Sequence, residues 1–284
     1  MAAEPSPVAL RSPALHRFFL AAFRRRARSG LRAIRLARWG RPAPLDGPVV
    51  VFANHPGWWD GVAFMVLAGA IFPARQMYAP MAAEALARYR FMRRIGVFGV
   101  EAGSARGALA FLRAAEQVLA SPAGMLWVNA PGRFMDARDR PVPIMPGLTR
   151  LAEMAPTASF LPLALEYPFW GEPRAEMLCA FGPPVTASSL RQQDRPGRAT
   201  TLAAALEATM DRLAEDAISR DPQRFETLLQ GREGMGGAWQ AWRRMGAALR
   251  GQPFDPRHEQ GPRHSEEPPH QPAPPAPGAA EDRR

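Results

Sequence analysis

The sequence predicts an α/β domain in which helices flank a mainly parallel sheet. Two observations lead to this prediction. Short apolar segments alternate along the chain with longer segments of helical periodicity, and such alternation favours parallel strands that are joined by helices. In addition, 47% of the 284 residues are apolar, which is enough for one large core.

The clearest strand signal is residues 49–53, with the sequence Val-Val-Val-Phe-Ala. A continuous, β-branched apolar run is typical of a strand buried on both faces. The longest apolar run, the 12 residues 61–72, follows it and predicts a buried or re-entrant helix. Spanning a bilayer takes about 20 apolar residues, so we expect no transmembrane helix. The N-terminus lacks the apolar segment of a signal peptide.

The remaining elements follow from the same patterns. Further strands are expected at 76–79, 96–100, 124–129, 160–167 and 175–181. Further helices are expected at 81–92, 104–120, 147–154, 201–220 and 238–250. Ser104 is suited to cap the helix that follows it.

The N-terminal segment is strongly basic. All basic residues of the chain are arginine, the net charge is +10, and ten arginines but no acid lie between Arg11 and Arg41. Such a segment should seek anionic surfaces, either phospholipid head groups or nucleic acid. Apolar residues recur at three- and four-residue steps at Leu20, Phe23, Ala27, Leu31 and Ile34. We therefore predict a basic amphipathic helix over residues 14–41 that lies in a membrane interface. The alternative is a basic helix packed on the protein's own core.

Composition divides the chain further. Residues 1–13 and the Pro-rich residues 252–284 are expected to be disordered. Between them we expect the basic helix, an α/β domain over 42–220 and a C-terminal helical extension over 221–251. Cys179 is the sole cysteine, so the chain has neither an intrachain disulfide nor a Cys-based zinc site.

One histidine stands out from the chain's five. His55 alone falls inside the predicted domain, directly after the strand 49–53, and Asp60 follows five residues later. Active sites of open α/β sheets lie at the carboxyl ends of strands. A neutral imidazole can take the proton of an alcohol that attacks a thioester, while a carboxylate orients the ring and stabilises the imidazolium. This pair is therefore the catalytic candidate, although the spacing alone is weak evidence.

Four segments in order carry a family resemblance. The first, residues 54–60 (Asn-His-Pro-Gly-Trp-Trp-Asp), resembles the His-x4-Asp signature of the glycerolipid acyltransferases, which include the lysophosphatidic-acid acyltransferases. Residues 96–101, 129–133 and 160–164 are similar to that family's second, third and fourth blocks, and 145–152 to the helix after the third. The similarity covers about residues 45–185. The order of the blocks is stronger evidence than any block alone.

Two departures concern the acceptor site. Ala102 follows Glu101 where many relatives carry an arginine, for which Arg106 is a candidate replacement. Pro131 stands where the family has a glutamate associated with acceptor binding. Gly132 still permits close backbone approach, and Arg133 still offers a bidentate fork for phosphate or carboxylate. The resemblance thus implies Gly132, Arg133 and Arg106 as substrate-binding residues. The alternatives are a structural salt bridge for Arg133 and a merely solvated side chain for Arg106.

The resemblance implies a single acyltransferase domain with helical additions at both ends. His55 and Asp60 would transfer a fatty acyl group from acyl-CoA or acyl-ACP to a lysophospholipid-like or other lipid alcohol, as in phospholipid biosynthesis. The implied enzyme needs no cofactor and no metal. It would act at the cytoplasmic face of a membrane as a peripheral or monotopic protein, in contact with its lipid acceptor, its thioester donor and, for acyl-ACP, the carrier protein.

Three alternative functions differ in how well the sequence supports them. A non-catalytic lipid-binding relative is consistent with the altered third block, although it would not need His55 and Asp60. A nucleic-acid binder is consistent with the arginines, but no recognisable nucleic-acid-binding module is present, so no nucleic-acid partner is expected. A serine hydrolase is disfavoured because Gly103-Ser104-Ala105-Arg106-Gly107 fails the Gly-x-Ser-x-Gly pattern.

Overall fold

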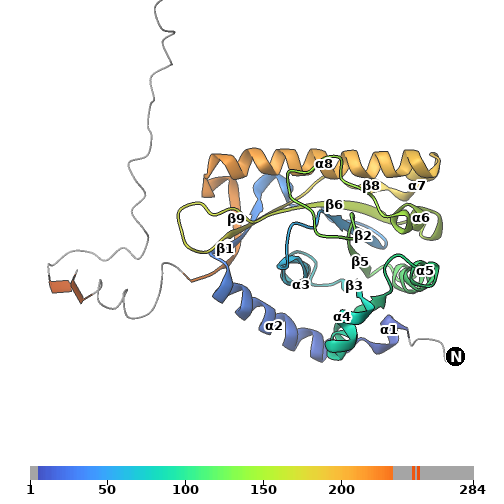
Figure 1. The fold of residues 1–284 in the computed structure, drawn as a ribbon, viewed down its shortest axis with the longest axis horizontal. Coiled ribbons are helices and arrows are strands. Elements are labelled where there is room, and N and C mark those ends of the chain that lie inside the picture. The colour runs from blue at the N-terminus through green and yellow to red at the C-terminus, as the bar shows by residue number, and fades with distance from the viewer. Residues whose placement is uncertain (1–5, 233–244, 247, 250–284) are drawn as a thin grey trace, which may run out of the picture.

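A computed structural model describes residues 6–232, 245, 246, 248 and 249 (Figure 1). Its helices are α1 (Pro7–Leu10), α2 (Pro13–Gly30), α3 (Asp60–Ile71), α4 (Ala83–Arg88), α5 (Ala105–Leu119), α6 (Pro146–Met154), α7 (Ala187–Arg191) and α8 (Arg195–Ser219). Short 3-10 helices are η1 (Arg38–Gly40), η2 (Arg90–Ile95) and η3 (Pro222–Arg224). The strands are β1 (Ala33–Ala37), β2 (Val49–Ala53), β3 (Gln76–Ala82), β4 (Val97–Val100), β5 (Gly124–Asn129), β6 (Ser159–Glu166), β7 (Glu176–Phe181), β8 (Val185–Thr186) and β9 (Phe225–Gln230).

The predicted α/β fold with a mainly parallel sheet is confirmed. The nine-stranded sheet has the order β4-β3-β5-β2-β6-β7-β1-β9, and β8 pairs with the start of β6. The first five strands in this order are mutually parallel, so their carboxyl ends meet at one edge of the sheet. β7 is antiparallel to β6, β1 is parallel to β7, and β9 is antiparallel to β1.

Helices cover both faces of the sheet. Apolar side chains of α5, α6, α7 and α8 form one core with one face, and those of α2, α3 and α4 form a second core with the other. In Figure 1, α8 lies above the sheet and α2 and α3 lie below it. Along β2, Val50 and Phe52 enter the first core, whereas Val49, Val51 and Ala53 enter the second. This two-sided burial explains the continuous apolar run.

The prediction of one helix over residues 14–41 is wrong in its second half. Helix α2 ends at Gly30, and residues 33–37 form β1, which pairs with both β7 and β9. A Cβ atom at Gly30 would lie 2.3 Å from the ring of Trp59, so this position needs glycine. Arg35 is buried in β1, where its Nε donates to Glu176 at 2.9 Å. The partners of this segment lie far along the chain, and helical periodicity cannot reveal them.

The apolar stripe of α2 faces the protein and not a membrane. Ala27 belongs to the core that α3 shares with the sheet, and Leu20 and Phe23 are partly buried against it. The close fit is evident at Gly69 of α3, where a Cβ atom would lie 2.6 Å from Leu20. The interpretation of this stripe as a membrane-embedded surface is therefore wrong, and its alternative, packing on the protein's own core, holds. Any membrane contact of α2 has to use its outward side.

Both ends of the domain differ from expectation. Within the segment 1–13 that was expected to be disordered, residues 7–10 form α1, and Pro7 is buried. Within the expected helical extension 221–251, residues 225–230 form β9 and extend the sheet next to β1. The predicted tail 252–284 lies outside the described residues, as does most of the predicted helix 238–250. No described helix has the length and apolarity that crossing a bilayer requires.

The lone cysteine offers a probe of the fold. Cys179 in β7 is fully buried, its thiol donates to the backbone oxygen of Arg35 at 3.2 Å, and burial raises its pKa. Because the thiolate is the reactive form, native Cys179 should react with a disulfide reagent at least about a hundredfold more slowly than in denaturant. Absorbance of the released thiol chromophore measures both rates. Equal rates would contradict the placement of β7 between β6 and β1.

Candidate functional site

Three adjacent parallel strands end around His55. It follows β2, and the strands on either side are β5 and β6. The chain leaving β5 passes the end of β2, since the Ala130 amide donates to the oxygen of Ala53 at 2.7 Å. Tyr167 comes directly after β6. The carboxyl edge of the sheet therefore gathers residues that lie more than 100 positions apart in sequence, as expected for an α/β site.

The structure brings His55 and Asp60 together. The ring Nδ1 of His55 lies 2.5 Å from Oδ2 of Asp60, a short hydrogen bond. The Asp60 side chain is fully buried, whereas 19% of the His55 side chain is exposed. When Nδ1–H donates to the Asp60 carboxylate, the neutral ring has its lone pair on Nε2. His55 can therefore accept a proton from a bound molecule while Asp60 fixes the ring's tautomer.

Asp60 is held from two further directions. The hydroxyl of Tyr167 donates to Oδ1 at 2.7 Å, and the backbone amide of Gly57 lies 3.3 Å from Oδ2. Asp60 also opens α3, where the helix dipole favours a negative charge. Burial, the charge of Asp60 and the hydrogen bond to it raise the pKa of Tyr167 well above its usual value. Tyr167 therefore remains a proton-bearing donor, and sequence reasoning had not identified it.

The loop after β5 covers the histidine. The ring of Phe134 contacts that of His55 with centroids 4.2 Å apart, and the Met135 amide donates to the backbone oxygen of His55 at 3.0 Å. Phe134 is itself largely exposed, so it forms an apolar wall at the entrance to the site. Its role was also missed from sequence, although it adjoins Arg133. An apolar wall beside the imidazole suits a substrate with a hydrocarbon portion.

Asn54 fixes the loop that carries the pair. Its side-chain amide donates to the backbone oxygen of Leu165 at 2.9 Å and accepts from the Leu165 amide at 2.8 Å. This bridge continues the pairing of β2 with β6 by one step beyond the last strand residue. It also explains structurally why an asparagine precedes His55. The bridge fixes the spacing between the strand ends that carry His55 and Tyr167.

The predicted substrate-binding residues lie at different distances along this edge. Gly132 has a left-handed φ of +66°, and a Cβ there would lie 2.6 Å from Met145. Arg133 is exposed in the loop beside Phe134, next to the pair. Arg106 is exposed in the first turn of α5 after β4, and both β3 and β5 lie between β4 and β2. Arg133 thus adjoins, in sequence, the residue that contacts His55, whereas Arg106 follows a strand that is separated from β2 by two others.

Position 131 and the next acid along the chain, Asp136, both have structural surroundings. Pro131, at the position of the family's glutamate, is buried. Asp136 is bound by Arg138 at 2.8 Å, which holds the pKa of that carboxyl well below its usual range. Neither residue offers a free carboxylate in place of the missing glutamate. Ser104 accepts from the Gly107 amide at 2.9 Å and is the helix cap that its sequence predicted. Its hydroxyl donates to the Glu101 carboxylate at 3.0 Å, and among the described residues no histidine bonds to it.

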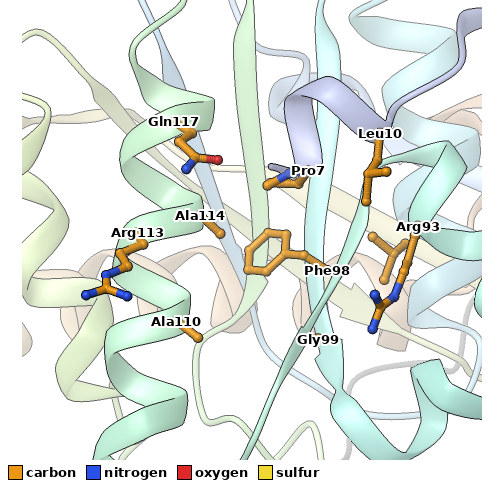
Figure 2. Close-up of a pocket in the computed structure, with 10 residues that line it drawn as sticks. Pro7, Leu10, Arg93, Phe98, Gly99, Ala110, Arg113, Ala114 and Gln117 are labelled. Atoms are coloured by element: carbon orange, nitrogen blue, oxygen red, sulfur yellow. The ribbon is translucent and has the colours of Figure 1, made fainter. Parts of the chain in front are cut away.

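A cavity of about 200 Å³ lies away from the pair, at the opposite end of the strand order from β9. Figure 2 shows Phe98 of β4 between Arg113 of α5 on one side and Arg93 of η2 on the other, with Pro7 and Leu10 of α1 close by. His55 and Asp60 do not line it. The cavity thus belongs to the edge formed by α1, β4 and α5, and we assign it no part in the site.

The described residues contain no group of three or more His, Cys, Asp or Glu side chains that could hold a metal ion. A scan against protein-family models gives no match to this chain, and neither does a search of curated proteins. The site is therefore interpreted from its own geometry. Its essential elements are a partly exposed imidazole, a buried carboxylate with three donors, and an apolar wall.

Tyr167→Phe tests the support of the carboxylate. Removing one hydrogen bond to a buried charged group should lower the free energy of unfolding by about 1–3 kcal/mol. If the acyl transfer proposed below occurs, it should slow by about tenfold, because each 1.4 kcal/mol of barrier is a factor of about ten. Urea denaturation and steady-state rates measure the two effects. Phe169→Ala, two residues on and exposed, is the control. An unchanged rate would show that Tyr167 does not position Asp60 for catalysis.

Proposed function

We propose that this chain is an acyltransferase that moves a fatty acyl group from an acyl thioester to the hydroxyl of a lipid alcohol. The observation that carries the proposal is the 2.5 Å hydrogen bond between His55 and the buried Asp60, at the carboxyl edge of the sheet. The resemblance of residues 54–60 to the glycerolipid acyltransferase signature supports the same chemistry. The donor is acyl-CoA or acyl-ACP, and no cofactor takes part.

The proposed reaction needs no covalent intermediate. The acceptor hydroxyl attacks the thioester carbonyl while Nε2 of His55 takes the hydroxyl proton, so that a C–O bond forms. Asp60 stabilises the resulting imidazolium through Nδ1. As the C–S bond breaks, the imidazolium returns the proton to the departing thiolate. The products are the acyl ester and the free thiol, and His55 is again neutral.

The surroundings of the pair support a lipid-like acceptor. Phe134 offers an apolar contact beside the imidazole, and Arg133 offers a fork for an anionic group on the same loop. Pro131 stands where the resembled family has a glutamate, so glycolipids, aminolipids and isoprenoid-derived alcohols are candidate acceptors beside lysophospholipids. We place the protein at the cytoplasmic face of a membrane, as a peripheral or monotopic enzyme.

A panel of acceptors tests the proposal. The full chain is incubated with labelled acyl-CoA or acyl-ACP and with lysophospholipids, glycolipids or other lipid alcohols, and the lipid products are separated. We expect one acceptor class to become acylated. Lipid binding without any acylation by the folded protein would overturn the proposal. That outcome would favour a non-catalytic lipid-binding relative, the alternative that the altered third block supports.

A further inference from the structure

An outward surface of arginines and aromatic rings is formed by α2 and by the segment around η2. We call it the arginine–aromatic face. Its members are exposed side chains of two segments far apart in sequence. They are Arg17, Phe18, Arg25 and Arg28 of α2, and Tyr89, Arg90, Phe91 and Arg94. In Figure 1, α2 and α4 both lie at the lower boundary of the molecule, and η2, which follows α4, packs against α2.

The two segments are joined by specific contacts. The Ser12 amide donates to the backbone oxygen of Arg94 at 2.8 Å, and Nδ1 of His16 lies 3.2 Å from the oxygen of Ile95. Phe19 stacks on Phe91 at 4.4 Å and meets Phe18 edge-on at 5.3 Å. The start of α2 and η2 therefore form one continuous surface. The order of residues along the chain does not indicate this juxtaposition.

Large aromatic side chains on this face are exposed to solvent. The exposed fractions are 65% for Phe18, 54% for Tyr89 and 41% for Phe91. Around Phe18, the other outward positions of α2 at residues 14, 21 and 22 are alanine. One and two helical turns after Ala21, the outward positions are occupied by Arg25 and Arg28. Exposed rings beside small apolar residues and cations match the boundary between lipid head groups and acyl chains.

The charge of the face is almost entirely uncompensated. Elsewhere in the described part of the chain, arginines pair with acids, as in Arg41–Glu226, Arg140–Asp211 and Arg224–Asp216. None of the ion pairs of the described residues includes an arginine of the face. No acid occurs between Arg11 and Arg41, and Glu84 is the sole acid between Asp60 and Glu101. Five arginines in one surface without acidic partners are complementary to an anionic sheet of phosphates.

The face continues to the catalytic pair. The guanidinium of Arg26, near the end of α2, lies 4.9 Å from the ring centroid of Trp59 and 6.0 Å from that of Trp58. Trp59 immediately precedes Asp60, and Trp58 is 67% exposed. A surface on which α2 lies would therefore contact Trp58, three residues from His55.

We propose that the arginine–aromatic face docks on a membrane rich in anionic phospholipid, with Trp58 at its margin and the His55 site at the interface. The docking surface is the outward side of α2 together with η2, and not the buried stripe of α2. The inference rests on the proposed function only for the position of the acceptor, since the face itself is defined by exposure and charge. Lipid is favoured over nucleic acid because apolar side chains alternate with the cations.

Flotation with liposomes tests the docking. The full chain, without acyl donor, is mixed with vesicles of phosphatidylcholine alone or with phosphatidylglycerol added. We expect binding to anionic vesicles that weakens with salt, and little binding to neutral ones. Arg17→Gln with Arg25→Gln should lower the affinity by roughly 25-fold, about fivefold for each arginine. Phe18→Ala with Tyr89→Ala should lower it by about tenfold or more at little cost to the fold, because both side chains are more than half exposed.

A matched variant on another surface is the control. Phe169 is as exposed as Phe18, and Arg191 and Arg195 are exposed on α7 and α8, so Phe169→Ala with Arg191→Gln and Arg195→Gln removes the same kinds of groups. This variant should bind vesicles normally. Equal losses in the control and face variants, or no loss in either, would overturn the proposal. Preferential binding to duplex DNA that is insensitive to Phe18→Ala would overturn it as well.

Separate measurements can contradict the membrane docking and the proposed acyl transfer. A detergent-dispersed acceptor measures acyl transfer without a membrane. Transfer to that acceptor by a chain that ignores anionic vesicles would overturn the docking alone. Binding to vesicles through the face by a chain that acylates no acceptor would support the docking and overturn the proposed function.

Discussion

Replacing His55 by alanine is expected to lower acyl transfer by roughly 10²–10⁴-fold, the range that general acid–base catalysis contributes. The imidazole is the group that accepts the hydroxyl proton, and its Nδ1 is already committed to Asp60 at 2.5 Å. No other histidine lies among the residues at the carboxyl ends of β2, β5 and β6. Water in the space left by the ring is a much weaker base in this position.

The loss should come without unfolding. The His55 side chain is partly exposed, and its main packing partner Phe134 is largely exposed, so removing the ring should cost less than about 2 kcal/mol of stability. Thermal melting and initial rates are measured on the same preparation. His16→Ala is the matched control, because His16 of α2 contacts the backbone oxygen of Ile95 just before β4, and β3 and β5 separate β4 from β2. Transfer at the native rate in His55→Ala would remove the proposed mechanism.

Asp60→Asn is expected to reduce the rate by a similar factor, roughly 10²–10⁴-fold, while nearly preserving the shape of the side chain. The asparagine carries no charge to stabilise the imidazolium. If its amide nitrogen faces Nδ1, the ring must move its proton to Nε2 and can no longer act as a base. The contact with the Tyr167 hydroxyl remains possible in either orientation, since a hydroxyl both donates and accepts.

The comparison with a surface carboxylate makes this result specific. Asp211 of α8 is exposed and pairs with Arg140. Asp211→Asn therefore removes a charge without touching His55 or Asp60. It should leave the rate unchanged. A near-native rate in Asp60→Asn would show that the short hydrogen bond to His55 is structural, and it would leave His55 without its proposed orienting partner.

Local patterns predicted the centre of the sheet. Residues 49–53 and 125–128 are continuous apolar runs because helices cover both faces of β2 and β5, and burial of that kind is visible in the sequence itself. Ser104 was recognisable as a cap because a helix N-terminus needs a nearby acceptor. The proximity of His55 and Asp60 was predictable because only four residues separate them and a helix starts at the second.

The elements that were missed depend on distant partners. β1 was assigned to a helix because Ile34 and Arg35 continue the periodicity of α2, whereas the strand is defined by β7 and β9, and Glu176 lies 141 residues beyond Arg35. β9 likewise becomes a strand only beside β1. Tyr167 joined the site only once β6 was known to lie next to β2. Sequence periodicity carries no information on such strand order.

The stoichiometry of a single reaction tests the central claim most directly. The purified chain is given labelled acyl thioester with and without the lipid alcohol that the panel identifies, and free thiol and acyl ester are quantified together. The account predicts that one ester forms for each thiol released, and that little thiol is released without the acceptor. Thiol release that is independent of acceptor and yields free fatty acid would mean hydrolysis and would contradict the proposed transfer.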